Sequence, residues 1–162
     1  MRKNFLIAFG IGIVCIGIAA WWVVYMQRGA YIDLPGKVLK VRTAPLDEAS
    51  AVAVIDFRVT NPADYPFVVR KVTVAMEDSS GSEAEGQTVS EVDARQLFQV
   101  IPLLGQKFND TLLMRDSVPP HGSWDRMVAA RFEVPESKLE ARKRLVVRIE
   151  EIDGKVFDLS EK

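Results

Sequence analysis

His121 and Cys15 are the side chains best suited to catalysis or metal binding, and each is the only one of its type in the 162 residues. A nucleophile needs a nearby base, and a transition-metal site needs several nitrogen or sulfur ligands. His121 lies in the turn-like sequence PPHGS, and Cys15 lies in an apolar stretch where it can form no intrachain disulfide. We therefore predict no catalytic residue, no metal site and no cofactor.

Acidic side chains are numerous, but their spacing does not bring them into one site. Asp78, Glu83 and Glu85 in DSSGSEAEG could supply oxygen ligands to calcium, yet they lack the ordered spacing of a dedicated calcium loop. We expect a solvated turn there. Glu150 and Glu151 would alternate between the two faces of a strand, so they would not act together as acid and base.

The charge balance argues against a nucleic-acid binder. The chain has a formal net charge of −1, and without Arg2 and Lys3 the remainder has 19 basic and 22 acidic residues, a net charge of −3. The densest basic run, KLEARKR, contains a glutamate and is typical of a solvated helix face. No basic cluster could neutralise a row of phosphates, so we expect no nucleic-acid partner.

Residues 5–26, FLIAFGIGIVCIGIAAWWVVYM, form a stretch of 22 residues without a charge. As a helix rising ~1.5 Å per residue it would be about 33 Å long, which matches a bilayer hydrocarbon core of ~30 Å. A cleavable signal has a shorter apolar region, and the greasy sequence AWWVVYM follows the candidate cleavage site at Ala19. We expect a retained signal-anchor transmembrane helix that contacts the lipid bilayer over residues 5–26.

The residues flanking this helix predict its orientation. Arg2 and Lys3 precede it and only Arg28 follows closely, which favours a cytoplasmic N-terminus. The chain would then be a single-pass protein of the cytoplasmic (inner) membrane. Its parts would be a cytoplasmic segment (1–4), the anchor (5–26), a short linker (27–35) and an extracytoplasmic, periplasmic domain (36–162).

Two sets of residues within the anchor suggest contacts. An aromatic belt at the far membrane interface is expected from Trp21, Trp22 and Tyr25. Small residues that share one helical face could let two helices approach as a homodimer, while a plain anchor is the alternative: Ala8, Gly12, Cys15 and Ala19.

The rest of the chain has the period-two alternation of half-buried strands. In AVAVIDFRVT the apolar face carries Ile55 and Phe57, and the opposite face carries Asp56 and Arg58. A tight turn is expected at Asp153-Gly154, within a terminal hairpin. The predicted strands are 36–43, 51–60, 67–77 and 123–134, with the hairpin over 144–159.

Two short helical insertions interrupt the strands. Ser90 and Asp93 can form a capping box, and apolar residues at helical spacing follow over SEVDARQLFQVI, ending before Pro102. A second capping box is expected at SKLE, residues 137–140. Six or seven strands with one or two helical insertions predict a mainly β fold, an antiparallel Ig-like β-sandwich.

The segment DFRVTNPADYPFVVRKVTVAMED resembles the strand-turn-strand of the WHy domain of late-embryogenesis-abundant group 14 proteins. In that family a strand ends in V-x-N-P, a proline-bearing turn follows, and a second alternating strand comes next. Val59, Asn61, Pro62 and Pro66 match this pattern. The resemblance implies an Ig-like sandwich and a role in stress protection. The helical insertion at 90–101 departs from the family pattern, and bacterial single-pass proteins with an exported domain are a second general likeness.

Residues 97–114, LFQVIPLLGQKFNDTLLM, have ten large apolar side chains without clean helical or strand spacing after Ile101. They could fold over the open end of the sandwich and complete its core. Alternatively Leu103, Leu104 and Phe108 could be exposed as a partner-docking or membrane-docking patch.

These observations lead to two hypotheses of function. The first is a non-enzymatic interaction or structural module of a cell envelope, with a protein partner. The second is a small-ligand or lipid-binding domain that uses residues 97–114 as a lid, and it requires an enclosed apolar pocket of roughly 300 Å³ or more.

Overall fold

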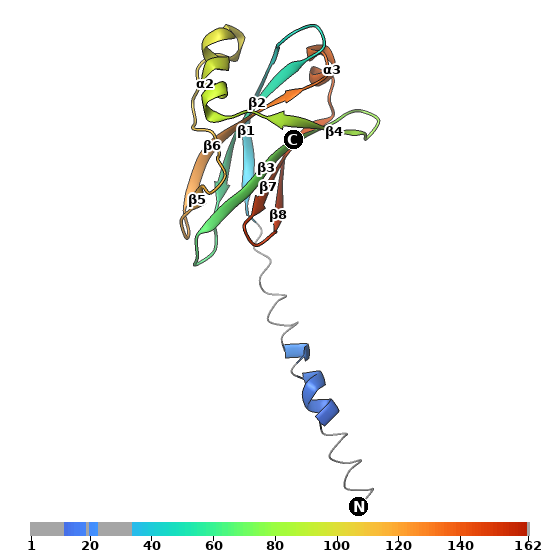
Figure 1. Cartoon of the computed structure of the whole chain (residues 1–162), viewed down its shortest axis with the longest axis vertical. Helices are drawn as coiled ribbons and strands as arrows, with labels where there is room; N and C mark the ends of the chain where they lie inside the picture. The colour runs from blue at the N-terminus through green and yellow to red at the C-terminus, as the bar shows by residue number, and fades with distance from the viewer. Residues whose placement is uncertain (1–11, 19, 23–33, 162) are drawn as a thin grey trace, which may run out of the picture. The chain divides into compact units, whose positions relative to one another are not determined.

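The computed structural model of the chain describes residues 12–18, 20–22 and 34–161. The chain divides into two compact units, Met1–Asp33 and Leu34–Lys162, which are considered separately below. Every strand and helix labelled in Figure 1 belongs to the second unit.

The membrane-spanning helix predicted over residues 5–26 is wrong. Within residues 12–18, 20–22 and 34–161, no helix is both long enough and apolar enough to cross a bilayer. The signal-anchor assignment, the single-pass placement in the cytoplasmic membrane and the extracytoplasmic position of 36–162 relied on that helix and are corrected with it.

The other predictions for the first unit fall partly outside the described residues. Trp21 and Trp22 are exposed on their helical stretch, whereas Tyr25 of the predicted aromatic belt lies outside the description. Of the small-residue face, Gly12 and Cys15 are described and exposed. Its two alanines, Ala8 and Ala19, lie outside the described residues.

The second unit is mainly β, as predicted, but its strands form one curled antiparallel sheet in place of two separate sheets. The strand order is β1-β2-β6-β4-β3-β7-β8, with the short β5 pairing β3. Figure 1 shows the sheet curling into a half-barrel. The strands are Gly36–Pro45 (β1), Ala51–Thr60 (β2), Phe67–Glu77 (β3), Glu83–Thr88 (β4), Ser117–Val118 (β5), Ser123–Phe132 (β6), Arg144–Glu151 (β7) and Val156–Ser160 (β8).

The predicted sandwich is only partly consistent with the structure, because β4 joins what would have been two sheets. The first four residues of β4, Glu83 to Gly86, pair with β3. Its last two residues, Gln87 and Thr88, pair instead with β6. The solvated turn predicted over DSSGSEAEG (78–86) is therefore wrong from Glu83 onward. Glycine and glutamate disfavour strands in isolation, and pairing with β3 overrides that preference.

The concave face of the sheet holds the main core. The alternation predicted for β2 is confirmed, because Ile55 and Phe57 point into this core and are fully buried. The short helix α3, Glu136–Glu140, adds the buried Leu139. Arg142 just beyond α3 binds both carboxylate oxygens of Glu161, 2.8 and 2.9 Å from its Nη2. The predicted capping box at Ser137 does not form, and Pro135 occupies the cap position without a side-chain bond.

The turn after β2 is fixed by Asn61, the residue that carried the resemblance given above. Its buried side-chain amide donates to the carbonyl oxygens of Tyr65 at 2.8 Å and Val118 at 3.1 Å. Its oxygen accepts from the backbone N–H of Ala63. Asn61 therefore satisfies backbone groups that the two prolines of the turn leave without strand partners.

Candidate functional site

A second, smaller core covers the convex face of β1, β2 and β6. The helix α2, Glu91–Val100, and the following 3₁₀ turn η1, Pro102–Leu104, lie over this face. The predicted helix is confirmed, with Ser90 as its N-cap accepting from the Asp93 N–H at 3.2 Å. The fully buried members of this core are Ala44, Val52, Val54, Ala94, Leu104, Met127 and Ala129.

A buried ion pair lies beneath the segment that follows α2. Arg42 of β1 donates to Asp56 of β2 at 2.7 Å, and their side chains are only 8% and 4% exposed. The other terminal nitrogen of Arg42 donates to the carbonyl oxygens of Leu104 at 2.6 Å and Gln106 at 2.7 Å. Asn109 donates to the second oxygen of Asp56 at 2.8 Å. The pair therefore binds the backbone that continues from η1.

Aromatic rings cover the Arg42 guanidinium. Its central carbon lies 4.9 Å from the centre of the Phe98 ring and 5.3 Å from that of Phe108. The ammonium of Lys40 lies 5.4 Å from the Phe108 ring centre. A cation near an aromatic face is attracted by the ring quadrupole, so Phe108 is held in place although it is largely exposed.

Glu91 joins the first turn of α2 to the same segment. Its carboxylate accepts from Lys107 at 3.0 Å and from the Thr111 N–H at 3.3 Å. Burial acts to raise the pKa of Glu91, but the hydrogen bonds from Thr111 and Lys107 and the charge of Lys107 outweigh it. Together they lower the pKa of Glu91 from its ordinary 4.5 to about 2.

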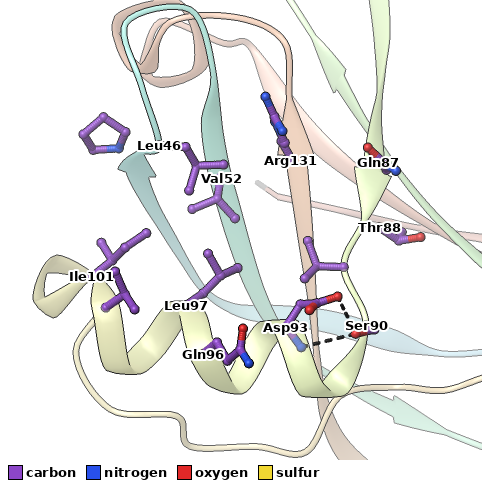
Figure 2. Close-up of a pocket in the computed structure, with 13 residues that line it drawn as sticks. Leu46, Val52, Gln87, Thr88, Ser90, Asp93, Gln96, Leu97, Ile101 and Arg131 are labelled. Carbon is purple, nitrogen blue, oxygen red and sulfur yellow. Dashed lines mark hydrogen bonds between the residues drawn. The ribbon is translucent and has the colours of Figure 1, made fainter.

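A cleft of about 540 Å³ lies between α2 and the strands beside it. Figure 2 shows Leu97 and Ile101 facing Leu46 and Val52 across it, with Gln87, Thr88 and Arg131 contributed by the strands. One side of the cleft is therefore aliphatic and the other is polar. Its lining residues are Pro45, Leu46, Val52, Gln87, Thr88, Val89, Ser90, Asp93, Gln96, Leu97, Val100, Ile101 and Arg131.

The charged groups that line the cleft are Arg131 of β6 and Asp93 of α2. Arg131 of β6 lies 3.8 Å from Asp47 of the β1–β2 turn, and both side chains are about half exposed (49% and 55%). A hydrogen bond from the Ser50 hydroxyl, followed by one from the Ala49 N–H, lowers the pKa of Asp47. Asp93 of α2 accepts a hydrogen bond from the Ser90 hydroxyl at 2.7 Å.

The residues predicted as a docking patch are divided by the structure. Leu103 and Phe108 are 75% and 62% exposed, whereas Leu104 is fully buried in the smaller core. Leu104 therefore completes a core, whereas Leu103 and Phe108 face solvent, and docking through these two residues stays a prediction.

The other chemically suited residues lie apart from the cleft. His121 has a backbone φ of 54° and its Nε2 lies 3.0 Å from a carboxylate oxygen of the exposed Asp64. Glu150 faces Arg70 at 3.2 Å while Glu151 is buried, so the two alternate as predicted, and burial raises the pKa of Glu151. Over residues 12–18, 20–22 and 34–161, no three His, Cys, Asp or Glu side chains are grouped to hold a metal.

The buried ion pair and the cleft were not predicted from the sequence. Asp56 interrupts an apolar run, AVAVIDF, and a charge inside such a run is a signal that a partner must be buried with it. No pattern in the sequence marks Arg131 as a cleft residue, because the cleft exists only where α2 lies over the strands.

Comparison with known proteins adds little to this geometry. No family model matches the chain, and no curated protein matches it. A solved structure described as the X-ray structure of Northeast Structural Genomics Consortium target SoR45 aligns with 80% of this chain and 80% of its own, at 12% identity and a TM-score of 0.34. A likeness at that level carries no argument, so the WHy resemblance stays a prediction.

Removing one partner of the buried ion pair should be strongly destabilising. We expect Asp56→Ala to lower the free energy of unfolding by about 3–5 kcal/mol, because it leaves the Arg42 charge buried and uncompensated. The matched control is Asp125→Ala, which breaks the exposed pair that Asp125 makes with Arg58 and should cost about 1 kcal/mol or less. Urea denaturation measures both. Equal losses in the two variants would contradict the role given to Asp56.

Glu91 should make stability sensitive to acid. Because folding lowers its pKa from 4.5 to about 2, its contribution is present above pH 4.5 and is lost as the pH falls toward 2. Glu91→Gln should therefore flatten the dependence of unfolding free energy on pH in that window, whereas Glu140→Gln, at an exposed position, should leave it steep. Denaturation of the two variants is measured between pH 5 and pH 2. Equal pH dependence in Glu91→Gln and Glu140→Gln would show that Glu91 does not bind Lys107 and Thr111 in solution.

Proposed function

We propose that the protein is a non-enzymatic binding module and that the cleft beside α2 is its ligand site. The observation that carries the proposal is the cleft itself, whose volume of about 540 Å³ lies within the range of small-molecule sites. Its walls are a helix and paired strands, and a site built on such elements is held more precisely than one built on loops.

Binding without chemistry is supported by the residue types in the lining. The described lining residues include no histidine, lysine or cysteine. The one hydroxyl–carboxylate pair is Ser90 with Asp93, which serves as the cap of α2. Because both groups serve in the cap, the described lining residues offer no separate base to activate the serine hydroxyl.

The segment predicted as a lid acts as one wall of the cleft. Leu97, Val100 and Ile101 supply its aliphatic side, and the continuation of the segment is held by Arg42. The cleft is a groove rather than the enclosed pocket expected, because Gln96 and Val100 on its wall are exposed. A bound ligand would keep one side in water.

Blocking the cleft should abolish binding of a simple amphiphile. With octan-1-ol as the probe, we expect concentration-dependent NMR shifts of the methyl groups of Val52, Leu97 and Ile101 in the full chain. Val100→Trp should weaken this binding at least tenfold by filling the groove.

The matched control for that experiment is Val92→Trp. Val92 is exposed on the same helix, like Val100, but does not line the cleft. Its variant should bind octan-1-ol as the wild type does. Methyl shifts that persist unchanged in Val100→Trp would refute the proposed site.

A second candidate function, a module that binds a protein partner, is favoured by exposed apolar side chains after α2. Leu103 is 75% exposed and Met114 is 69% exposed, together with Phe108. Apolar surface left in water on a folded domain often marks a contact site. Membrane docking is not included in this candidate.

A charged residue in place of Leu103 should distinguish partner binding from ligand binding in the cleft. Leu103→Glu should remove a stoichiometric partner that the wild type retains, while octan-1-ol binding stays the same. Ile152→Glu, at a comparably exposed residue (61%) in the β7–β8 turn, should retain that partner. Quantitative co-purification with both variants makes the comparison, and equal recovery of the partner would count against a surface at Leu103.

A further inference from the structure

Arg131 is the one cation among the described residues that line the cleft. It stands on β6 where β4 is joined, with its Cα paired to that of Gln87. Both residues also line a smaller hollow of about 250 Å³ on the other side of this junction. The guanidinium therefore belongs to the polar side of the cleft, opposite its aliphatic wall (Figure 2).

Most of the donor capacity of Arg131 is unused by the protein. A guanidinium carries five N–H donors in a planar fork suited to a carboxylate. Its only recorded ion pair, within residues 34–161, is the 3.8 Å contact with Asp47, which is too long for a hydrogen bond. By comparison, Arg42 and Arg142 each make close hydrogen bonds to carboxylates.

Two acidic groups near the cleft, Asp47 and Asp93, are engaged by their own segments. Asp47 accepts from the Ser50 hydroxyl at 2.6 Å and from the Ala49 N–H at 2.8 Å. Asp93 accepts from Ser90 and lies in the first turn of α2, where the helix dipole favours a negative charge. The guanidinium of Arg131, which is half exposed, can therefore accept the carboxylate of a ligand as a hydrogen-bonding partner.

Where they border the cleft, β4 and β6 pair with each other, and Pro45 at the end of the edge strand β1 has no N–H to donate. Gln87 and Thr88 pair with Arg131 and Ala130, and the Val89 N–H donates to the Ala129 carbonyl oxygen at 2.9 Å. A peptide that adds a strand needs a free sheet edge. The site is consequently better suited to a compact molecule than to an extended chain.

We propose that the cleft binds a small amphipathic carboxylate, with the carboxylate on the Arg131 guanidinium and the aliphatic chain against Leu97, Val100 and Ile101. This inference rests on the proposed function and adds the chemical class of the ligand. Charge complementarity at one end and apolar burial at the other would select it over a neutral or cationic molecule of the same length.

Octanoate, octan-1-ol and octylammonium test the head group at a constant chain length. In the wild type, octanoate should bind about tenfold more tightly than octan-1-ol, and octylammonium more weakly than either. Only the affinity for octanoate should fall as ionic strength rises, because its ion pair is partly exposed.

Variants of Arg131 test whether its guanidinium binds the carboxylate of the ligand. Arg131→Gln should lower the affinity for octanoate about tenfold and so remove the preference for octanoate over octan-1-ol, and Arg131→Lys should lower it less. Arg95→Gln is the control for net charge, since Arg95 is exposed on α2 and does not line the cleft.

The outcomes separate this inference from the function on which it rests. If none of the probes binds, the proposed function fails and the inference fails with it. If octanoate and octan-1-ol bind equally and Arg131→Gln changes neither, the cleft is a ligand site but the carboxylate class is wrong. Octylammonium binding more tightly than octanoate would overturn the inference, as would tighter binding of a short peptide with an apolar C-terminus.

Discussion

The pairing of Arg42 with Asp56 is the constraint on which the convex side of the molecule depends. Two opposite charges taken out of water are tolerated only when the geometry is good and the remaining hydrogen-bonding groups are satisfied. Here the carbonyl oxygens of Leu104 and Gln106 and the amide of Asn109 supply most of those partners. The requirement to satisfy the pair thus places the backbone after α2, and through it the helix that walls the cleft.

The position of β2 explains why a domain of this size has two cores. Its residues from Ala51 to Phe57 are buried on both faces, so it needs a covering layer on each side. The curl of the sheet supplies one layer, because β3 and β7 fold back over the concave face. The segment from α2 to η1 supplies the other. Without that segment Val52 and Val54 would face water.

Much of the fold could be predicted from the sequence, but the candidate site could not. Alternation gave the bounds of β2 and β3, and helical spacing with a cap gave α2, since these signals are local. The strand β4 was missed because its glycine and glutamates disfavour strands in isolation, and they form one here only through their pairing with β3. The burial of Asp56 was also missed. Alternation along the strand assigns Asp56 to one face of the sheet, but it does not reveal that another segment covers that face. The length and lack of charge of residues 5–26 predict a membrane span, but no described helix is long and apolar enough to be one.

Because β4 changes its pairing partner from β3 to β6, the two halves of the sheet are joined by few hydrogen-bonded pairs. Only two residue pairs, at Gln87 and Thr88, carry the ladder from β4 onto β6, whereas ten pairs join β2 to β6. Gly86 is the last residue of β4 that pairs with β3, and it cannot be replaced without movement of its neighbours, because a Cβ there would come within 2.7 Å of the Phe132 ring. The junction between the two halves of the sheet is thus its thinnest point, and a side chain at Gly86 beside it would have to displace Phe132. Gln87 and Thr88 also border the cleft. A molecule bound there would therefore hold β4 and β6 together and slow the exchange of the amide protons of Gln87 and Thr88.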